Sequence, residues 1–216
     1  EKKIRGQERE AKKTLELIER VLPLLREGRP ARLAEIEDDE RAAFKALGLL
    51  TAKPVLYVCN VGEDAAATGN AYSARVEERR AEGAGCVIIS AKIEAELAEL
   101  GPEERRAYLT ELGLAEPGLN RLIREGYKLL DLITYFTAGP KEARAWTVPV
   151  GTRAPQAAGV IHTDFEKGFI RAETIAYEEY VALGGEAGAR DAGKLRLEGK
   201  DYVVKDGDVL HFRFAN

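Results

Sequence analysis

Two apolar runs separated by an amphipathic stretch dominate the pattern of hydrophobic and polar positions. Residues 55–59 (Val-Leu-Tyr-Val-Cys) and 85–89 (Gly-Cys-Val-Ile-Ile) are continuous apolar segments of strand length. The intervening residues 69–83 predict a helix. A continuous apolar run with helices on either side is typical of a buried parallel strand. The pattern therefore predicts a strand–helix–strand unit with a right-handed crossover.

A short polar motif follows each of these expected strands. Residues 60–63 (Asn-Val-Gly-Glu) follow the first strand, and residues 90–92 (Ser-Ala-Lys) follow the second. Ligands of parallel sheets bind beside the carboxyl ends of the strands. If the two strands are neighbours, the two motifs lie side by side, and we expect them to form one binding site.

The first 26 residues show a different periodicity, with apolar or small residues at heptad a and d spacing. These positions are Ile4, Ala11, Leu15, Ile18, Leu22 and Leu25. The spacing favours one limb of a coiled-coil hairpin, and an ordinary surface helix packed on its own domain is the alternative. We expect Pro23 to bend or interrupt this helix, and residues 28–30 (Gly-Arg-Pro) to end it.

Further helices are expected on both sides of the strand–helix–strand unit. One begins at the acidic pair of residues 38 and 39 and runs to residue 47, before a glycine. A second continues from the Ser-Ala-Lys motif through residues 93–100. Pro102 suits the first position of a helix over residues 103–112, and the apolar face of residues 117–133 predicts a longer amphipathic helix.

Strand signals dominate after a Gly-Pro break at residues 139 and 140. The expected strands are residues 144–148, 168–175, 202–204 and 209–214, and the expected short helices are residues 152–162 and 177–183. Residues 205–208 (Lys-Asp-Gly-Asp) have the composition of a hairpin turn between the last two strands. Short mixed strands with one or two helices predict a compact α+β domain, such as a ubiquitin-like β-grasp.

Composition excludes some functions and leaves others open. The chain has 216 residues, 45% of them hydrophobic and 32% charged, and no apolar run is long enough to cross a membrane. The formal net charge of −4 gives no support for nucleic-acid binding, and no DNA partner is expected, although a local basic patch is compatible with this charge. The chain contains no methionine, even at position 1, so we expect a further segment upstream.

Cysteine and histidine positions suggest no metal site. Cys59 and Cys86 both fall in expected strands, and we interpret them as small core residues in a reducing cytosol. Zinc ligation is not expected, because there is no C-x-x-C motif and His162 and His211 lie far away in the sequence. The run of residues 162–164 (His-Thr-Asp) is interpreted as a helix end or a packed segment rather than as a catalytic site.

Three long strings near the C-terminus carry a resemblance to one family. Residues 136–147, 159–173 and 201–214 resemble the C-terminal TGS domain of the YchF-type (Obg-like) ATPases, within the P-loop GTPase superfamily. Residues 50–57 and the Asn-x-x-Glu loop resemble the base-recognition region of that family. The helical segment before them resembles the returning limb of its coiled-coil arm, so the resemblance covers essentially the whole chain.

The resemblance implies an adenine-specific nucleotide site. In the guanine-specific members, the Asp of Asn-Lys-x-Asp accepts hydrogen bonds from the guanine base. Here Glu63 stands at that position, and Val61 replaces the Lys whose stem covers the base. Both departures weaken the case for guanine, so the implied cofactor is ATP with Mg²⁺. The implied base-binding residues are Asn60, Val61, Glu63, Ser90, Ala91 and Lys92.

The phosphate-binding motifs of the family do not occur in these 216 residues. There is no G-x-x-x-x-G-K-[S/T] string and no Asp-x-x-Gly string. Because the P-loop cradles the phosphates and supplies a Mg²⁺ ligand, we expect the Mg²⁺ ligands outside this sequence. We assign no catalytic residue and no metal ligand to this chain, and we expect it to be inactive as an ATPase on its own.

The resulting expectation is an α/β chain of three parts: a helical coiled-coil arm (residues 1–52), part of a parallel-sheet P-loop NTPase domain (53–134) and an α+β β-grasp TGS domain (135–216). The resemblance implies a cytoplasmic, weakly hydrolysing ATPase that binds ribosomes. The alternative is a non-catalytic RNA- or ribosome-docking module that uses the arm and the TGS domain. Basic residues of the last part fit either an RNA contact or an ordinary mixed surface; they are Lys141, Arg144, Arg153, Lys167 and Arg171.

Overall fold

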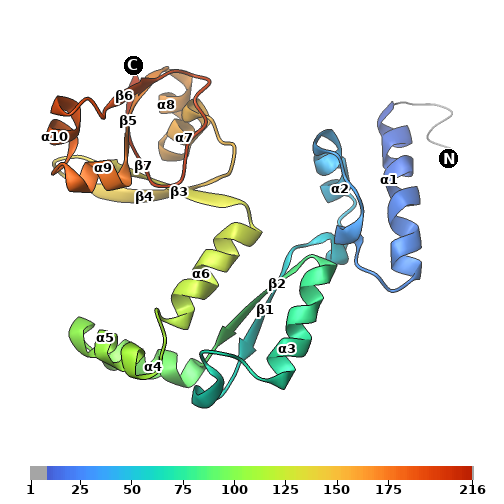
Figure 1. Ribbon diagram of the computed structural model, residues 1–216. Coiled ribbons are helices and arrows are strands. Elements are labelled where there is room, and N and C mark those ends of the chain that lie inside the picture. The colour runs from blue at the N-terminus through green and yellow to red at the C-terminus, as the bar shows by residue number, and fades with distance from the viewer. Residues whose placement is uncertain (1–8, 216) are drawn as a thin grey trace. The chain divides into compact units, whose positions relative to one another are not determined.

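The chain divides into two compact units, with the division between Leu129 and Leu130. The computed structural model describes residues 9–215 (Figure 1). Ile4, the first of the expected heptad positions, lies outside the described residues.

The first unit is a two-stranded parallel sheet with helices before, between and after its strands. Its helices and strands are α1 (Arg9–Arg26), α2 (Arg41–Ala46), β1 (Val55–Asn60), α3 (Ala71–Glu77), β2 (Ala84–Ile89), α4 (Ala91–Glu99), α5 (Pro102–Glu111) and α6 (Gly118–Leu129). Short 3₁₀ helices are η1 (Ala31–Leu33), η2 (Asp38–Glu40), η3 (Leu50–Ala52), η4 (Glu63–Ala65) and η5 (Glu78–Glu82).

The pairing of β1 with β2 confirms the expected strand–helix–strand unit. The strands are parallel and in register, from Val55 opposite Ala84 to Asn60 opposite Ile89. The crossover helix α3 is capped by Asn70, whose Oδ1 accepts hydrogen bonds from the first turn of the helix at 3.0 Å. Figure 1 draws α3 and α6 on either side of the two strands, and both helices contact them. The two polar motifs therefore leave the sheet at the same edge.

Helix α1 buries a face other than the expected heptad face. Leu17 and Val21 are 1% and 2% exposed, and α1 packs against α2 and η1. The predicted a and d residues Ile18 and Leu22 remain 41% and 39% exposed. Within this unit the apolar pair at i and i+4 faces the core, and the heptad face is left for a partner limb, so the coiled-coil interpretation stays a prediction.

Pro23 does not interrupt α1, contrary to that part of the prediction. The helix continues past the proline to Arg26. It then ends as expected at the glycine, where Gly28 adopts a φ of +71°, a conformation that favours glycine.

The second unit is a mixed five-stranded sheet with four short helices in residues 130–215. Its elements are β3 (Leu132–Ala138), β4 (Ala143–Pro149), α7 (Ala154–Ile161), α8 (Thr163–Lys167), β5 (Phe169–Ala176), α9 (Tyr177–Ala182), α10 (Glu186–Asp191), β6 (Arg196–Glu198) and β7 (Asp208–Phe214). The strand order is β4-β3-β7-β5-β6, and β3 pairs with β7 in parallel while the other pairs are antiparallel. The expected α+β architecture is confirmed for this part.

Two expected boundaries in this region were wrong. Ile133 was assigned to a helix, but α6 ends at Leu129 and Ile133 lies in β3. Asp131 has a φ of +51°, and this left-handed residue separates helix from strand. Residues 202–204 are not a strand, because Val204 donates its N–H to the carbonyl of Thr152 before α7 rather than to a neighbouring strand.

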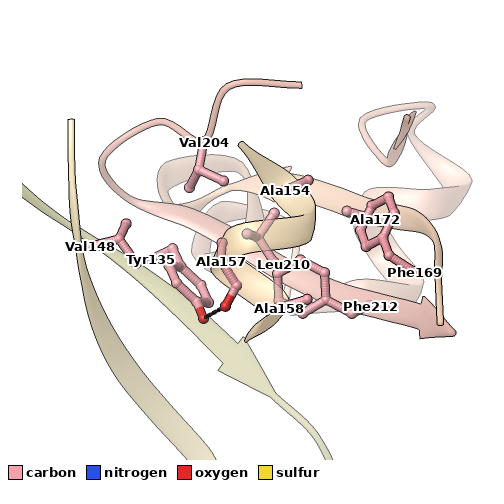
Figure 2. Packing of buried hydrophobic residues seen from close by; sticks show 10 residues of the cluster. All are labelled: Tyr135, Val148, Ala154, Ala157, Ala158, Phe169, Ala172, Val204, Leu210 and Phe212. Atoms are coloured by element: carbon pink, nitrogen blue, oxygen red, sulfur yellow. Dashed lines mark hydrogen bonds between the residues drawn. The ribbon is translucent and has the colours of Figure 1, made fainter. Parts of the chain in front are cut away.

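The core of the second unit lies between the sheet and α7. Its fully packed members are Tyr135, Val148, Ala154, Ala157, Ala158, Phe169, Ala172, Val204, Leu210 and Phe212. The alanines of α7 are 0% exposed, so the helix lies close to the sheet. Figure 2 shows the hydroxyl of Tyr135 pointing at the carbonyl of Ala157, to which it donates a hydrogen bond of 2.8 Å. This bond satisfies the one polar group that Tyr135 brings into the core.

Candidate base-recognition site

The loops after β1 and β2 lie side by side at the carboxyl edge of the parallel pair. The N–H of Val61 donates to the carbonyl of Ile89 at 2.9 Å, which carries the backbone pairing beyond the end of β1. Val61 and Ser90 are buried, at 9% and 4% exposed. These two residues hold the loops in place, while Asn60, Glu63 and Lys92 face solvent.

Asn60 joins the first loop to the second. Its Oδ1 accepts a hydrogen bond of 3.0 Å from the N–H of Ala91, the first residue of α4. Helices leave their first N–H groups without intrahelical partners, and the usual capping residue here, Ser90, makes no side-chain cap. Asn60 therefore supplies the cap from the neighbouring strand. Its amide NH₂ group has no protein partner within residues 9–215, so it is available to a ligand.

Glu63 and Lys92 form a second tie between the same loops. The Lys92 ammonium lies 2.7 Å from the Glu63 carboxylate. This carboxylate raises the pKa of Lys92 and keeps it charged. Lys92 also lies 3.9 Å from Glu96, one turn further along α4. Glu96 in turn accepts a hydrogen bond from the Tyr108 hydroxyl, which raises the pKa of Tyr108 to about 12.

Both loops rest on one small apolar cluster. It contains Ala66, Ile93, Leu97, Leu109 and Leu114. Ala66 follows η4 of the first loop, and Ile93 follows Lys92 of the second. Sequence reasoning assigned the six loop residues but missed Glu96 and Tyr108, although the i, i+4 spacing of Lys92 and Glu96 on a helix is a signal for the first of them.

The chemistry of this arrangement suits binding rather than bond cleavage. A neutral amide donor, an ion-paired carboxylate and backbone groups surround the edge of the sheet. Such groups recognise the polar edge of a flat heterocycle by hydrogen bonds.

Cys86, the third residue of β2, is not suited to nucleophilic chemistry. Its pKa is raised to about 12, chiefly by burial and also by Glu77 and Cys59, so its thiol is a poor nucleophile.

A cluster of potential metal ligands in the second unit is neutralised by arginines. Glu173, Glu186 and His211 have ligand atoms within 4.8 Å of one another. Glu173 lies 3.0 Å from Arg213, which lowers the pKa of the glutamate, and Glu186 lies 2.7 Å from Arg190. With guanidinium groups already on both carboxylates, this cluster is an ion-pair network rather than a cation site.

His162 has a structural role, in line with the sequence expectation. It caps α8, with its Nδ1 accepting from the N–H of Asp164 at 3.2 Å. None of the helices within residues 9–215 combines the length and the apolar character that crossing a membrane requires.

Comparison with known proteins shows what the chain is similar to. The family model YchF-GTPase_C, described as "Protein of unknown function (DUF933)", matches residues 132–215. The "Ribosome-binding ATPase YchF" of Pasteurella multocida (strain Pm70) is 54% identical over 215 residues, which cover 99% of this chain and 59% of the relative. The chain is a homologue of the C-terminal portion of YchF. The Bacillus subtilis (strain 168) YchF is 52% identical over 202 residues, covering 92% of this chain and 55% of its own length.

Solved structures agree with the YchF assignment. The Schizosaccharomyces pombe YchF GTPase superposes with a TM-score of 0.81 at 36% identity, covering 94% of this chain and 55% of that one. A GTP-binding protein from Pyrococcus horikoshii OT3, at 19% identity and a TM-score of 0.56, shares the fold. The chain thus spans between half and two thirds of the length of these YchF relatives.

Proposed function

We propose that the loops after β1 and β2 are the base-binding side of an ATP site in a cytoplasmic, ribosome-binding, weakly hydrolysing YchF-type ATPase. The observation that carries this proposal is the hydrogen bond from the N–H of Ala91 to the side chain of Asn60, which connects the loop after β1 to the loop after β2. Relatives of this chain are named ribosome-binding ATPases. In this proposal residues 1–52 form an arm, residues 53–134 belong to the nucleotide-binding domain and residues 135–216 form the TGS domain.

The residues of the two loops suit adenine better than guanine. The free amide NH₂ of Asn60 offers a donor to N7 of a purine, and the backbone carbonyl near Val61 offers an acceptor to a 6-amino group. Guanine would need the Glu63 carboxylate for its N1–H and 2-amino groups, but that carboxylate is paired with Lys92. Ser90, Ala91 and Lys92 would form the other wall of the base pocket.

ATP with Mg²⁺ would bring the phosphoryl group that the whole protein transfers to water. The residues of this chain contribute base selection and position, and the proposal assigns phosphate and Mg²⁺ binding to the P-loop part of the family. Affinity for ATP in this chain alone should therefore be weak, since hydrogen bonds to a base edge contribute only about 1 kcal/mol each.

Equilibrium titration of fluorescent ATP and GTP analogues with Mg²⁺ tests this proposal. We expect a full-length YchF relative to bind ATP more tightly than GTP, and this chain to bind both weakly or not at all. Asn60→Ala, made in a chimera that joins the P-loop part of a relative to this chain, should weaken ATP binding about tenfold. The matched control is Asn120→Ala, an exposed asparagine on α6. A preference for GTP, or equal binding by both variants, would overturn the base assignment.

A second candidate function is docking on RNA or the ribosome without nucleotide chemistry. The observation that favours it is on β4, an edge strand, where the guanidinium of Arg144 lies 4.1 Å from the centre of the Trp146 ring. An exposed arginine stacked on an aromatic ring is a surface on which bases stack in single-stranded RNA complexes.

Co-sedimentation with ribosomes in the absence of nucleotide separates the two candidates. If this chain pellets with ribosomes as efficiently as a full-length relative, and Arg144→Ala reduces pelleting while Lys200→Ala does not, the docking module is supported. If pelleting requires the full-length protein and ATP, docking by this chain alone is excluded.

A further inference from the structure

Lys92 lies between two carboxylates beside the candidate base-recognition loops. Its ammonium is 2.7 Å from Oε1 of Glu63 and 3.9 Å from Oε1 of Glu96. Only the first distance is that of a direct contact, because hydrogen bonds between ammonium and carboxylate groups are about 2.7–2.9 Å long. A lysine carries its charge on a flexible stem, and the side chain of Lys92 is 69% exposed. A small rotation of this side chain would therefore exchange one carboxylate for the other.

The hydroxyl of Tyr108 holds the second of these carboxylates. It donates a hydrogen bond to Oε2 of Glu96, whereas Oε1 is the oxygen that lies nearer Lys92. Tyr108 belongs to α5, and its ring packs against the apolar cluster on which both loops rest. The hydrogen bond to Glu96 also raises the pKa of Tyr108, so the hydroxyl keeps its proton at neutral pH. Glu96 is thus held by a donor that is itself fixed by packing.

This hydrogen bond weakens the competition of Glu96 for Lys92. A carboxylate that already accepts a hydrogen bond has part of its negative charge satisfied, and it attracts a second donor less strongly. The ammonium is left in direct contact with Glu63, as observed. Without the hydroxyl, Glu96 would be an unpartnered carboxylate four residues from Lys92 on the same helix, a spacing that favours an ion pair.

The choice that Lys92 makes decides whether Glu63 is free to bind a base. A carboxylate paired with an ammonium has little capacity left for further donors, whereas a free carboxylate can accept from both the N1–H and the 2-amino group of guanine. Adenine has no 2-amino group, and its N1 is an acceptor, so an adenine base does not use this carboxylate. Pairing of Glu63 with Lys92 therefore acts against guanine alone.

We propose that Tyr108 is a positioning residue for base selection. By holding Glu96, it leaves Lys92 on Glu63 and so keeps the site closed to guanine. This inference rests on the proposed function of the two loops as a base-binding site. Tyr108 itself does not contact the base, and it acts only through Glu96 and Lys92.

Titration of fluorescent ATP and GTP analogues against the chimera with the P-loop part of a relative tests this inference through the ratio of the two affinities. Tyr108→Phe keeps the packed ring and removes the donor, so GTP binding should strengthen about threefold relative to ATP, the range of an exposed ion pair. Glu96→Gln removes the competing charge, so the ratio should stay unchanged or shift toward ATP. Tyr108→Phe combined with Glu96→Gln should then have no effect of its own.

Lys92→Gln separates a failure of this inference from a failure of the proposed function. It frees Glu63 directly, so GTP binding should strengthen about tenfold relative to ATP. If Lys92→Gln changes the ratio and Tyr108→Phe does not, the base site stands and the role of Tyr108 is overturned. If neither substitution changes the ratio, Glu63 does not face the base, and the proposed function fails together with this inference.

Tyr72→Phe and Glu99→Gln are the matched controls. Tyr72 is an 80% exposed residue of α3, and Glu99 is an exposed residue of α4. Both substitutions should leave the ratio unchanged. A general loss of stability weakens the binding of both nucleotides alike, so it does not imitate a change in the ratio. An equal change of the ratio by Tyr108→Phe with and without Glu96 would show that the tyrosine does not act through this glutamate, and would overturn the inference.

Discussion

Asn60 illustrates how one side chain can serve both the fold and a ligand. Its carbonyl oxygen caps α4 from the neighbouring strand, and its NH₂ group is left exposed. Tyr135 shows the opposite arrangement, because its side-chain hydroxyl is already hydrogen-bonded within the core. At the scale of residues, the distinction between structural and functional polar groups in this chain rests on which hydrogen-bonding atoms are already satisfied.

Tyr135→Phe should lower the free energy of unfolding of the second unit by about 1 kcal/mol, the net value of a typical buried hydrogen bond. The substitution removes the hydroxyl that donates to Ala157 and keeps the ring. Denaturant unfolding followed by circular dichroism measures the difference. Tyr177→Phe, at a half-exposed ring in the same unit, is the control and should change stability by less than about 0.5 kcal/mol.

The carboxylate of Glu173 should make a contribution to folding stability that is lost in acid. Hydrogen bonding to Arg213 lowers the pKa of this carboxyl below its usual value of 4.5. A lowered folded pKa stabilises the folded state above the unfolded pKa, and the contribution is lost as the pH falls through the folded value. The difference in unfolding free energy between the unsubstituted chain and Glu173→Gln should therefore shrink below about pH 4.5. Glu178→Gln, on the exposed side of α9, should show no such narrowing.

At the scale of elements, glycines in two helices make a sharp contrast. A Cβ at Gly188 in α10 would lie 1.9 Å from the carbonyl oxygen of Leu183, whereas a Cβ at Gly126 in α6 would have no atom within 4 Å. Helix α10 needs Gly188 so that the preceding loop can approach it. In α6, Gly126 only lowers the helix propensity relative to alanine.

Gly188→Ala should destabilise the second unit by about 1–3 kcal/mol, because a backbone carbonyl has to move. Gly126→Ala should stabilise its helix by about 0.5–1 kcal/mol. Thermal unfolding of the two variants measures both changes in stability, which should be a decrease for Gly188→Ala and an increase for Gly126→Ala. Destabilisation by both substitutions would show that crowding at Gly188 is not the cause.

Elements with a strong local pattern were predictable, and those set by tertiary contacts were not. The two parallel strands follow from apolar runs, and the polar motifs follow those strands as expected; base recognition by these loops stays a prediction. The buried face of α1 was missed because its sequence carries two overlapping apolar stripes, and only packing against α2 chooses Leu17 and Val21. The approach of Cys59 and Cys86 had no sequence signal, because strand pairing brings their sulfur atoms to 3.7 Å from each other.

At the scale of the whole molecule, the two units differ in how their sheets are held. In the described part of the chain β1 has one partner, β2, and Tyr57 and Val58 in it are 37% and 44% exposed. Strand β7 has partners on both sides, and Leu210 in it is 1% exposed. Local opening should therefore require less free energy in the first unit than in the second.

Native-state hydrogen exchange measures this difference. Amides of β7 should exchange about tenfold more slowly, or slower still, than amides of β1. Exchange of both strands at one common rate would indicate that the units open together and would contradict the expectation.

The two connections between the loops after β1 and β2 respond differently to salt. The Glu63–Lys92 pair is exposed, and at about 1 M salt the screening length falls to about 3 Å, so its attraction is weakened. The bond between Asn60 and Ala91 joins neutral groups and is insensitive to ionic strength. In a solution of high ionic strength, the neutral hydrogen bond would therefore be the main connection between these loops. Base preference measured at high salt would therefore belong to a site in which the Glu63 carboxylate is held less tightly by Lys92.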